Sequence, residues 1–383
     1  MRYKKVFIVD ISGRVPEYDE GLCDGLSKTA TNMDIIFVAP YDKKFKFMIP
    51  SIKLLKIVPN GLSQGRLRRV IKFFEIIMNY FYLLILVMRN KPNVVQMEWL
   101  PLIEKFEGEF IFLKVIKSIL PNCKILLKIH NIFPHECITY EDRNIYIKRY
   151  QKVSKIVDAF IVHTQSSKRE VSSCFEIEMS KIHVIHHGVF APNGIEIEKK
   201  EFGALGKWNL LMYGIQSKYK GADILLKALA KIPNELKDKL NVKIVGLMSD
   251  DYYHELCAIQ TGVNVQIKPS FIEFPDLYKM INESDIIILP YRNISQSGVL
   301  LLALHFNRCL ITSDLDSFKE TLDGFEDRWF FHSEDSSSLA NLISDYLTDK
   351  INILKQIDII KNLNNKYSWK EAGRLNVELV NNL

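Results

Sequence analysis

The chain has 383 residues, which is enough for two or three domains. Hydrophobic residues make up 48% of it and charged residues 25%, and this composition excludes a disordered chain, a collagen-like fibre and a disulfide-stapled mini-protein. The 51 lysines and arginines exceed the 45 acidic residues only slightly, giving a formal net charge of +6. That charge is compatible with phosphate, acidic lipid or nucleic acid and selects none of them.

The cysteines and the amino terminus indicate a cytoplasmic protein. Six cysteines are spread along the chain without a CxxC pair or a zinc-type spacing, so we expect reduced thiols. The apolar run that begins at Val6 ends at Asp10, which is too short for the hydrophobic region of a secretory signal. The first residues predict a β-strand instead.

Short apolar runs rich in β-branched residues alternate with helical segments along the whole chain. Several runs, such as 286–289, are apolar without interruption, as in strands buried on both faces of a parallel sheet. Strands separated by helices predict βαβ units and doubly wound α/β sheets. The predicted strands are 6–9, 35–39, 94–98, 124–129, 159–163, 183–186, 208–213, 242–246, 265–268, 285–291 and 309–313.

The series of strands restarts near Trp208, after a segment with proline, glycine and charge but no clear period. We interpret residues 1–190 and 208–365 as two similar domains and residues 191–207 as the linker between them. Residues 366–383 lie beyond the second of these domains.

The segment 66–91 requires a decision about a membrane. Its uninterrupted apolar part after Asn79 has only about nine residues, whereas a spanning helix needs about 20. Three interpretations remain open: a helix largely buried on the sheet, a helix whose basic start rests on anionic lipid, or true insertion into the membrane. The basic start consists of Arg66, Arg68, Arg69 and Lys72.

In the second half, residues 213–223 (YGIQSKYKGAD) predict a strand that ends at Gly214, a loop with Lys218 and Lys220, and then a helix. Ligands bind at the carboxyl ends of strands in open α/β sheets, and two lysines there can neutralise a diphosphate. The alternative is a solvated, lysine-rich turn.

A second polar loop follows the strand that ends at residues 290–291 and leads into an apolar helix. Ser297 is placed to cap that helix, which leaves first-turn amides free to face an anion. The alternative is an ordinary capped core helix.

In the first half, His130 and Asn131 follow a buried strand directly, and His135 and Glu136 come soon afterwards. Polar residues at a strand end are candidates for a ligand site, and a structural histidine is the alternative. The histidines at 186–187 close another strand, where a hinge element, a phosphate contact and a simple strand end all remain open.

In their order and spacing these segments resemble the family 4 glycosyltransferases of the GT-B fold. The first loop, DISGRVPEYDEGL, and the segment YSWKEA, which starts the terminal helix, are similar to that family as well. The resemblance is carried by HNIFPHE, DAFIVHTQSSKREV, IHVIHHGVF, YGIQSKYKGADILLKAL and IIILPYRNISQSGVLLLAL.

The resemblance implies a GT-B fold, with two facing Rossmann-like domains of doubly wound parallel sheet and a C-terminal helix that crosses back to the first domain. The second domain would bind a nucleotide-sugar, UDP- or GDP-linked, and the first would bind a saccharide acceptor. No cofactor, metal or nucleic-acid partner is implied.

The resemblance also implies roles for single residues. His130 matches a histidine beside the donor sugar and Lys220 a diphosphate-binding lysine, so these two are the candidate catalytic residues. Residues expected at the nucleotide and diphosphate are Gly214, Lys218, Lys220, Gly246, Ser297, Gly298 and Val299. Residues expected beside the donor sugar or the acceptor are His130, Asn131, His135, Glu136, Ser295, Gln296 and Glu320.

The chain departs from the family in one respect. Many members carry two glutamates in the segment that reads YRNISQSGVLLLALHFN here, and this segment has no carboxylate. Ser295, Gln296 and Ser297 can supply hydrogen bonds in place of the first glutamate, whereas Leu302 or Ala303 cannot replace the second. We expect an active subfamily with altered donor recognition; a non-catalytic GT-B partner protein and a nucleotide-sugar 2-epimerase are the alternatives.

We expect a lipid-linked acceptor at the inner face of a bacterial cytoplasmic membrane, as in O-antigen or capsule synthesis. Lysines and a helix N-terminus can stabilise the leaving diphosphate, so a metal is not obligatory. The stereochemistry stays open: the leaving phosphate assists in a retaining reaction, and His130, His135 and Glu136 are the candidate bases in an inverting one.

Overall fold

The computed structural model describes residues 4–13, 15–40, 49–56, 66–103, 106–133, 139–189, 197, 201–348 and 351–383. The chain divides into two compact units. The first unit comprises Met1–Gly188 and Ser368–Leu383, and the second comprises Val189–Tyr367. The sequence placed these divisions at 190 and 366, and it placed a linker over 191–207, a segment that belongs here to the second unit.

The first unit is built on a sheet of seven parallel strands in the order β3-β2-β1-β4-β5-β6-β7. β1 lies between β2 and β4, so that Val6 has Ile35 on one side and Val94 on the other. The strands are β1 (Lys4–Val9), β2 (Met33–Ala39), β3 (Ser51–Lys53), β4 (Val94–Met97), β5 (Lys124–Lys128), β6 (Ala159–Val162) and β7 (Ile182–Val184).

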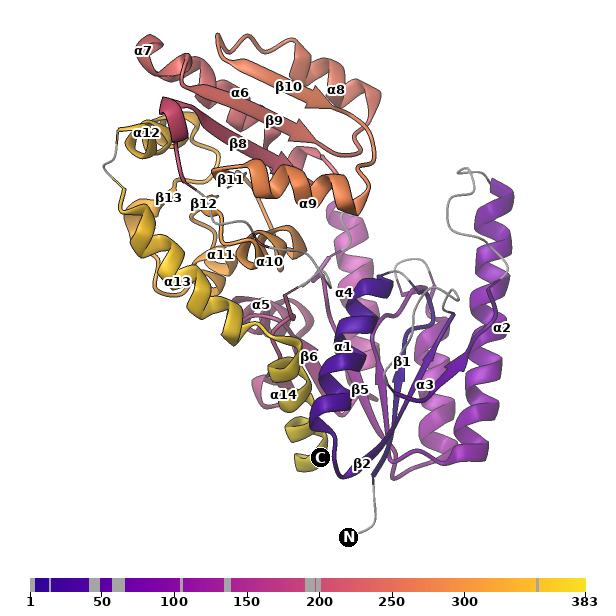
Figure 1. Cartoon of the computed structure of the whole chain (residues 1–383). Coiled ribbons are helices and arrows are strands. Elements are labelled where there is room, and N and C mark those ends of the chain that lie inside the picture. The colour runs from indigo at the N-terminus through magenta and orange to yellow at the C-terminus, as the bar shows by residue number, and fades with distance from the viewer. Residues whose placement is uncertain are drawn as a thin grey trace. The chain divides into compact units, whose positions relative to one another are not determined.

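Helices cover both faces of this sheet (Figure 1). Threonine caps fix where two of them begin, because the side chains of Thr139 and Thr164 accept hydrogen bonds from the amides of Asp142 and Ser167. The helices are α1 (Pro16–Thr29), α2 (Arg66–Asn90), α3 (Gly108–Ile119), α4 (Tyr140–Ser154), α5 (Gln165–Phe175), the 3₁₀ turn η1 (Met179–Lys181) and the terminal α14 (Trp369–Asn382).

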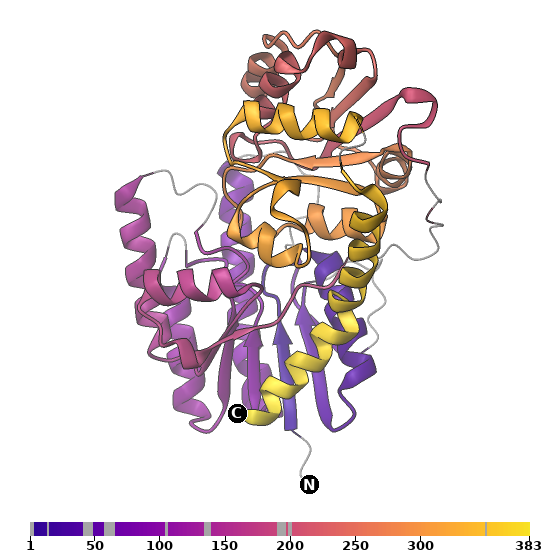
Figure 2. The same ribbon diagram turned by 90° about the vertical axis from the view of Figure 1, so that its left-hand side faces the viewer.

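The terminal helix α14 packs against α1, and Figure 2 shows it running along the sheet of the first unit. The crossing is close because glycines face each other: a Cβ on Gly25 would lie 2.0 Å from the Trp369 carbonyl oxygen, and one on Gly373 would lie 2.4 Å from the Gly25 carbonyl carbon. The Trp369 ring fills the space that side chains at Gly21 and Gly188 would occupy. The expected return of the last helix to the first domain is confirmed.

α2 has an unusual distribution of polarity. Leu83 and Val87 are buried, as expected for a helix on a sheet, but Phe74 and Phe81 are exposed on the opposite side. The interpretation of α2 as a largely buried helix is therefore wrong for the side that carries Phe74 and Phe81. Among the described residues, α2 is the helix that is long and apolar enough to cross a membrane, with a mean hydropathy of 1.9 over Arg68–Asn90. Of its most apolar stretch, 39% is buried inside the protein.

The second unit repeats the architecture with six parallel strands in the order β10-β9-β8-β11-β12-β13. Its core includes Trp329 and Phe331, both fully buried. The strands are β8 (Trp208–Tyr213), β9 (Leu240–Val245), β10 (Asn264–Lys268), β11 (Ile286–Leu289), β12 (Cys309–Ser313) and β13 (Phe330–Phe331).

Helices again cover the sheet: α6 packs against α12, and α10 against α13. The expectation of two doubly wound α/β halves is confirmed, whereas β3 and β13 were not predicted because they have only three and two residues. The helices and turns are η2 (Ala204–Gly206), η3 (Lys218–Lys220), α6 (Ala222–Lys231), α7 (Asn234–Lys237), α8 (Asp250–Cys257), α9 (Phe274–Glu283), α10 (Gly298–His305), α11 (Asp316–Thr321), η4 (Asp327–Trp329), α12 (Ser336–Leu347) and α13 (Ile353–Lys366).

The glycine contact between α1 and α14 generates a stability prediction. Helix propensity alone would make Gly25→Ala stabilising by about 1 kcal/mol. The new Cβ would overlap the Trp369 backbone, so we expect the free energy of unfolding of the first unit to fall by about 2 kcal/mol in a denaturant titration. Ser27→Ala, on the exposed side of the same helix, is the control and should change stability little. Unchanged stability in Gly25→Ala would contradict the close crossing.

Candidate functional site

The second sheet has a topological switch point between β8 and β11. From β8 the strand order runs through β9 to β10 on one side, and from β11 through β12 to β13 on the other. In such sheets the loops that leave the two central strands diverge and create a ligand crevice at their carboxyl ends. The two loops singled out in the sequence, after β8 and after β11, lie at this place.

Lys220 is buried in the loop after β8, at only 6% exposure. Its ammonium lies close to Gly214, where an added Cβ would be 3.1 Å from Nζ, and 5.5 Å from the centre of the Tyr291 ring. Burial lowers the pKa of Lys220 to about 8. No carboxylate forms an ion pair with it in the described part of the chain, so the site holds a desolvated cation that an anion would stabilise.

Glycines bring the backbones of this region together. Gly246 has φ of 131°, and a Cβ there would lie 2.0 Å from the Gly214 carbonyl oxygen. Gly221 has φ of 75°, and its Cβ would lie 2.0 Å from the Pro290 carbonyl oxygen. Since neither site has room for a side chain, the loops after β8, β9 and β11 are held in direct backbone contact.

Arg292 joins the loop after β11 to the start of α6. Its guanidinium donates two hydrogen bonds to the Asp223 carboxylate, at 3.0 and 2.8 Å, and another to the Lys218 carbonyl oxygen. Burial alone raises the pKa of Asp223, but the hydrogen bonds from Arg292 and Lys227 hold this pKa below its usual value. Arg292 is therefore committed to a bidentate structural pair.

Lys218 lies in a different environment from Lys220. Its side chain is 74% exposed, and its ammonium pairs with the Glu255 carboxylate at 2.9 Å. The two lysines of the predicted diphosphate loop thus differ: one is buried at the switch point and the other is on the surface. The structure does not bring the Lys218 ammonium into the buried environment of Lys220.

The loop after β11 ends at the start of α10, as the sequence indicated. The Ser297 hydroxyl accepts a hydrogen bond from the Leu300 amide at 3.1 Å, which leaves the amides of Gly298 and Val299 at the open first turn. Val299 lies beside Lys220, since both approach the same face of Gly214 within 3.1 Å of its added Cβ. A cation and a helix start therefore point to one anion site.

The neighbouring loop residues are polar and partly buried. The Gln296 side-chain oxygen is buried and accepts no hydrogen bond from the residues that the structure describes. Ser295 is half-buried, and the Ser317 hydroxyl fixes the loop by donating to the Ile294 carbonyl oxygen at 2.8 Å. The Gln296 side-chain oxygen is thus available to a ligand, whereas its role at the donor stays a prediction.

The region lacks a carboxylate for a nucleotide ribose at the expected place. Leu302 and Ala303 are buried in the core of the unit. Glu320 lies at the end of α11, where its carbonyl oxygen accepts a hydrogen bond from the Tyr367 hydroxyl at 3.4 Å. Its role beside the donor sugar stays a prediction.

The first unit has its own polar cluster at the carboxyl ends of β1, β4, β5 and β6. Lys128 is 3% exposed and its ammonium pairs with the Glu98 carboxylate at 2.7 Å. It also donates a hydrogen bond to the Tyr18 hydroxyl at 2.8 Å. These charges are buried but mutually compensated, unlike the charge of Lys220.

Asp10 and Asp19 form a second buried pair in this cluster. Burial, and then the charge of Asp10, raise the pKa of Asp19 well above its usual value. The protonated form of Asp19 is therefore favoured by its surroundings. Asp10 also accepts hydrogen bonds from the Ser12 amide and hydroxyl, both at 2.8 Å.

His130 is held by aromatic rings and by a second histidine. The Trp99 ring stacks on it with centres 4.0 Å apart, and the Tyr18 ring meets it edge-on at 4.8 Å. His163 Nδ1 lies 2.9 Å from the Ile185 carbonyl oxygen, so this nitrogen carries the proton.

The tautomer of His130 follows from that of His163. Burial, followed by the charges of His187 and Lys128, lowers the pKa of His163 well below its usual value, so its ring is neutral and Nε2 accepts. His130 Nδ1, at 3.1 Å, must therefore donate to it. His130 Nε2 is buried and lies 3.9 Å from the Glu98 carboxylate.

The remaining predicted residues of the first unit differ in position. Asn131 is half-buried beside His130, whereas His135 and Glu136 lie outside the described residues. The pair at 186–187 packs under the terminal helix: burial lowers the pKa of His187 to about 4, and its ring lies 5.2 Å from Trp369. This placement favours the strand-end interpretation of the pair.

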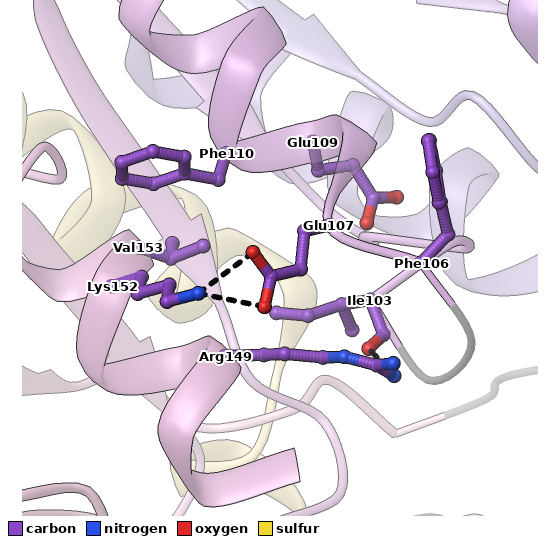
Figure 3. Close-up of a pocket in the computed structure, with 8 residues that line it drawn as sticks. All are labelled: Ile103, Phe106, Glu107, Glu109, Phe110, Arg149, Lys152 and Val153. Atoms are coloured by element: carbon purple, nitrogen blue, oxygen red, sulfur yellow. Dashed lines mark hydrogen bonds and ion pairs between the residues drawn. The ribbon is translucent and has the colours of Figure 1, made fainter. Parts of the chain in front are cut away.

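A small hollow lies between α3 and α4 in the first unit. Figure 3 shows Lys152 and Glu107 paired in it, with Lys152 donating to both Glu107 oxygens at 2.8 Å. Arg149 donates to the Ile103 carbonyl oxygen at 3.0 Å. We assign no ligand to this hollow. Among the described residues, no three His, Cys, Asp or Glu side chains are placed to hold a metal ion together.

Several residues of these sites had no role assigned from the sequence. A sequence signal was available for Lys128, Glu98 and Asp10, since each is a charged residue at or just after the end of a buried strand. Arg292 had none, because its partner Asp223 is far away in sequence.

Comparison with known proteins gives a family match for the second unit. Residues 194–365 match the family model for glycosyl transferases group 1. The chain is also 26% identical over 135 residues, 35% of its length, to GDP-mannose:glycolipid 4-beta-D-mannosyltransferase of Xanthomonas campestris pv. campestris. A second protein of that name and pathovar is 21% identical over 60% of the chain. The chain spans 38% and 61% of these relatives, less than two thirds of their length.

Solved structures resemble the whole chain in fold. A glycosyltransferase from Rickettsia africae has a TM-score of 0.67 at 16% identity and covers 99% of this chain and 98% of its own. Anabaena HepE, solved in complex with UDP-glucose, has a TM-score of 0.65 at 14% identity, with both chains fully covered. The two doubly wound sheets thus share the GT-B fold of these solved structures, and the second unit is similar to the glycosyl transferases group 1 family over residues 194–365.

Proposed function

We propose that the protein transfers a sugar from a nucleoside diphosphate sugar to a lipid-linked saccharide in the synthesis of a bacterial surface polysaccharide. The observation that carries the proposal is Lys220, a buried cation at the switch point of the second sheet that has no carboxylate partner among the described residues. Negative charge develops on the diphosphate as the glycosidic bond breaks, and a preorganised ammonium beside a helix start stabilises it.

The donor would be bound by Lys220, by the amides of Gly298 and Val299 and by the loop at Gly214. Lys218 would approach only from the surface and serve as a weaker, screened contact. The name of the curated relatives supports GDP-mannose, and the HepE complex supports UDP-glucose, so both are candidates. Because these groups are cationic or dipolar, the proposed reaction needs no metal ion.

The acceptor would be bound by the first unit, with His130 as the candidate base. With its Nδ1 proton donated to His163, His130 would take up a proton at Nε2. The name of the relatives includes a glycolipid acceptor, which supports a lipid-linked saccharide. We further propose a cytoplasmic protein that contacts the inner membrane face through Arg66, Arg68, Arg69 and Lys72, although Lys72 also pairs with Glu75 at 2.6 Å.

Lys220→Ala should abolish most donor binding, with at least a hundredfold loss in kcat/KM, because the buried charge contact is lost. Lys218→Ala, an exposed lysine of the same loop, is the matched control and should lose less than tenfold. Steady-state kinetics with excess EDTA measures both variants and tests metal independence. Equal losses in the two variants would refute the separate roles of the lysines.

Donor affinity should fall as pH rises above about 8. Burial lowers the pKa of Lys220 to about 8, so at higher pH the ligand-free protein holds a neutral amine and donor binding must also take up a proton. The dissociation constant should rise by up to about tenfold per pH unit, measured by calorimetry. Lys218→Ala should keep this dependence, whereas a flat profile in the wild type would contradict the assignment.

A thermal-shift screen of UDP-, GDP-, ADP- and CMP-sugars should identify the donor. A ligand at a hundred times its dissociation constant stabilises the native state by about 2.7 kcal/mol, so the true donor gives the largest shift. The shift should disappear in Lys220→Ala. Absence of a shift with every sugar would favour the non-catalytic alternative.

His163→Phe should lower kcat by about tenfold or more and alter the pH profile, with little change in the donor KM, because His130 loses the acceptor that fixes its tautomer. His163→Gln places a side-chain oxygen near His130 Nδ1 and should recover part of the rate. His183→Phe, a half-buried histidine of β7, is the control. A structural role alone would lower stability and leave the pH profile unchanged.

A further inference from the structure

The outer face of α2 is apolar over most of its length. Phe74 and Phe81 are 60% and 61% exposed, and no charged side chain is exposed between Lys72 and Arg89. This stretch is about 25 Å long at 1.5 Å per residue. The exposed apolar side chains of α2 are Val70, Phe73, Phe74, Met78, Phe81, Tyr82, Ile85 and Met88, and we call them the outer face.

The neighbouring helix extends this surface. Phe106, just before α3, and Ile111 within it are exposed, and the Phe106 ring lies 6.4 Å from the Phe73 ring. Figure 1 shows α2 at the edge of the first unit with α3 beside it. An exposed apolar surface of this kind marks an interaction site.

The polar residues in the middle of α2, Glu75 and Asn79, point inward instead. Asn79 is buried and forms two hydrogen bonds with the backbone of Leu55: its side-chain oxygen accepts from the amide at 2.8 Å, and its nitrogen donates to the carbonyl oxygen at 3.0 Å. The buried Glu75 pairs with Lys72. The helix thus has the reverse of the polarity expected for a helix at a water-exposed surface.

These inward contacts argue against a membrane span. A spanning α2 would have to leave the sheet, which would take Asn79 away from Leu55 and place Glu75 in hydrocarbon. The helix can instead keep its packing and lie flat, with only the outer face in the lipid.

The charges at the two ends of the outer face indicate the partner. Arg68 and Arg69 stand in the first turn of α2, and Arg89 stands in its last turn. A second copy of the chain on this face, parallel or antiparallel, would bring arginines onto arginines. An anionic lipid surface complements both ends at once.

We propose that α2 is an interfacial membrane anchor that inserts its outer face among the acyl chains of an anionic bilayer while its terminal arginines contact the headgroups. This extends the electrostatic lipid contact proposed above by an apolar component that salt does not screen. It rests on the proposed membrane location and not on the transferase chemistry.

The test is flotation of the full-length protein with vesicles of phosphatidylcholine containing about a third phosphatidylglycerol. Wild-type protein should float, and part of the binding should persist at about 1 M salt, where the screening length is about 3 Å. The combined variant Phe74→Ser, Met78→Ser, Phe81→Ser should bind at least tenfold more weakly. The matched control, Phe271→Ser with Leu354→Ser, removes exposed apolar side chains of the second unit and should bind like wild type.

Further readouts separate the outcomes. Phe81→Trp should show fluorescence quenching by brominated acyl chains, and Phe271→Trp should not. Donor-induced thermal shifts should be equal in all variants, which tests the second unit independently of lipid. Vesicle binding that the triple variant retains, or that about 1 M salt abolishes, would overturn the anchor. So would a dimer in sedimentation that the triple variant dissociates without losing vesicle binding.

Discussion

A desolvated ammonium group without a carboxylate beside it is the constraint on which the donor side of this protein depends. Burial lowers the pKa of Lys220 to about 8, and the described residues around it form no ion pair with it. Burial of this charge lowers the stability of the folded protein, and binding of an anionic ligand restores it. An uncompensated buried charge is therefore a stronger indication of a functional site than an exposed lysine such as Lys218.

Backbone contact maintains that environment. Gly246 lies against the Gly214 carbonyl, and Gly221 against the Pro290 carbonyl, so the ends of the central strands have no freedom to separate. Arg292 then bonds Asp223 and the Lys218 carbonyl oxygen, which joins the two loops without adding charge to the ligand site. The buried charges of the first unit differ in this respect, because Lys128 and Glu98 compensate each other.

Apolar periodicity predicted the two sheets because buried parallel strands have a strong local signal, and the strand ends located both candidate sites. What the sequence did not predict depends on contacts between distant residues. His130 was found from its position after β5, but the tautomer it adopts depends on His163 and the Ile185 carbonyl. Lys218 and Lys220 look equivalent in the sequence, and only the fold buries one and exposes the other.

α2 shows how buried polar contacts also determine a surface. Turning the helix about its axis would bury Phe74 and Phe81, which the hydrophobic effect favours. That rotation would break both bonds between Asn79 and Leu55 and leave an amide and a carbonyl group without partners at the end of β3. The inward polar residues therefore hold the aromatic residues outward. An apolar face that specific hydrogen bonds hold in solvent is better explained by a partner that covers it than by loose packing.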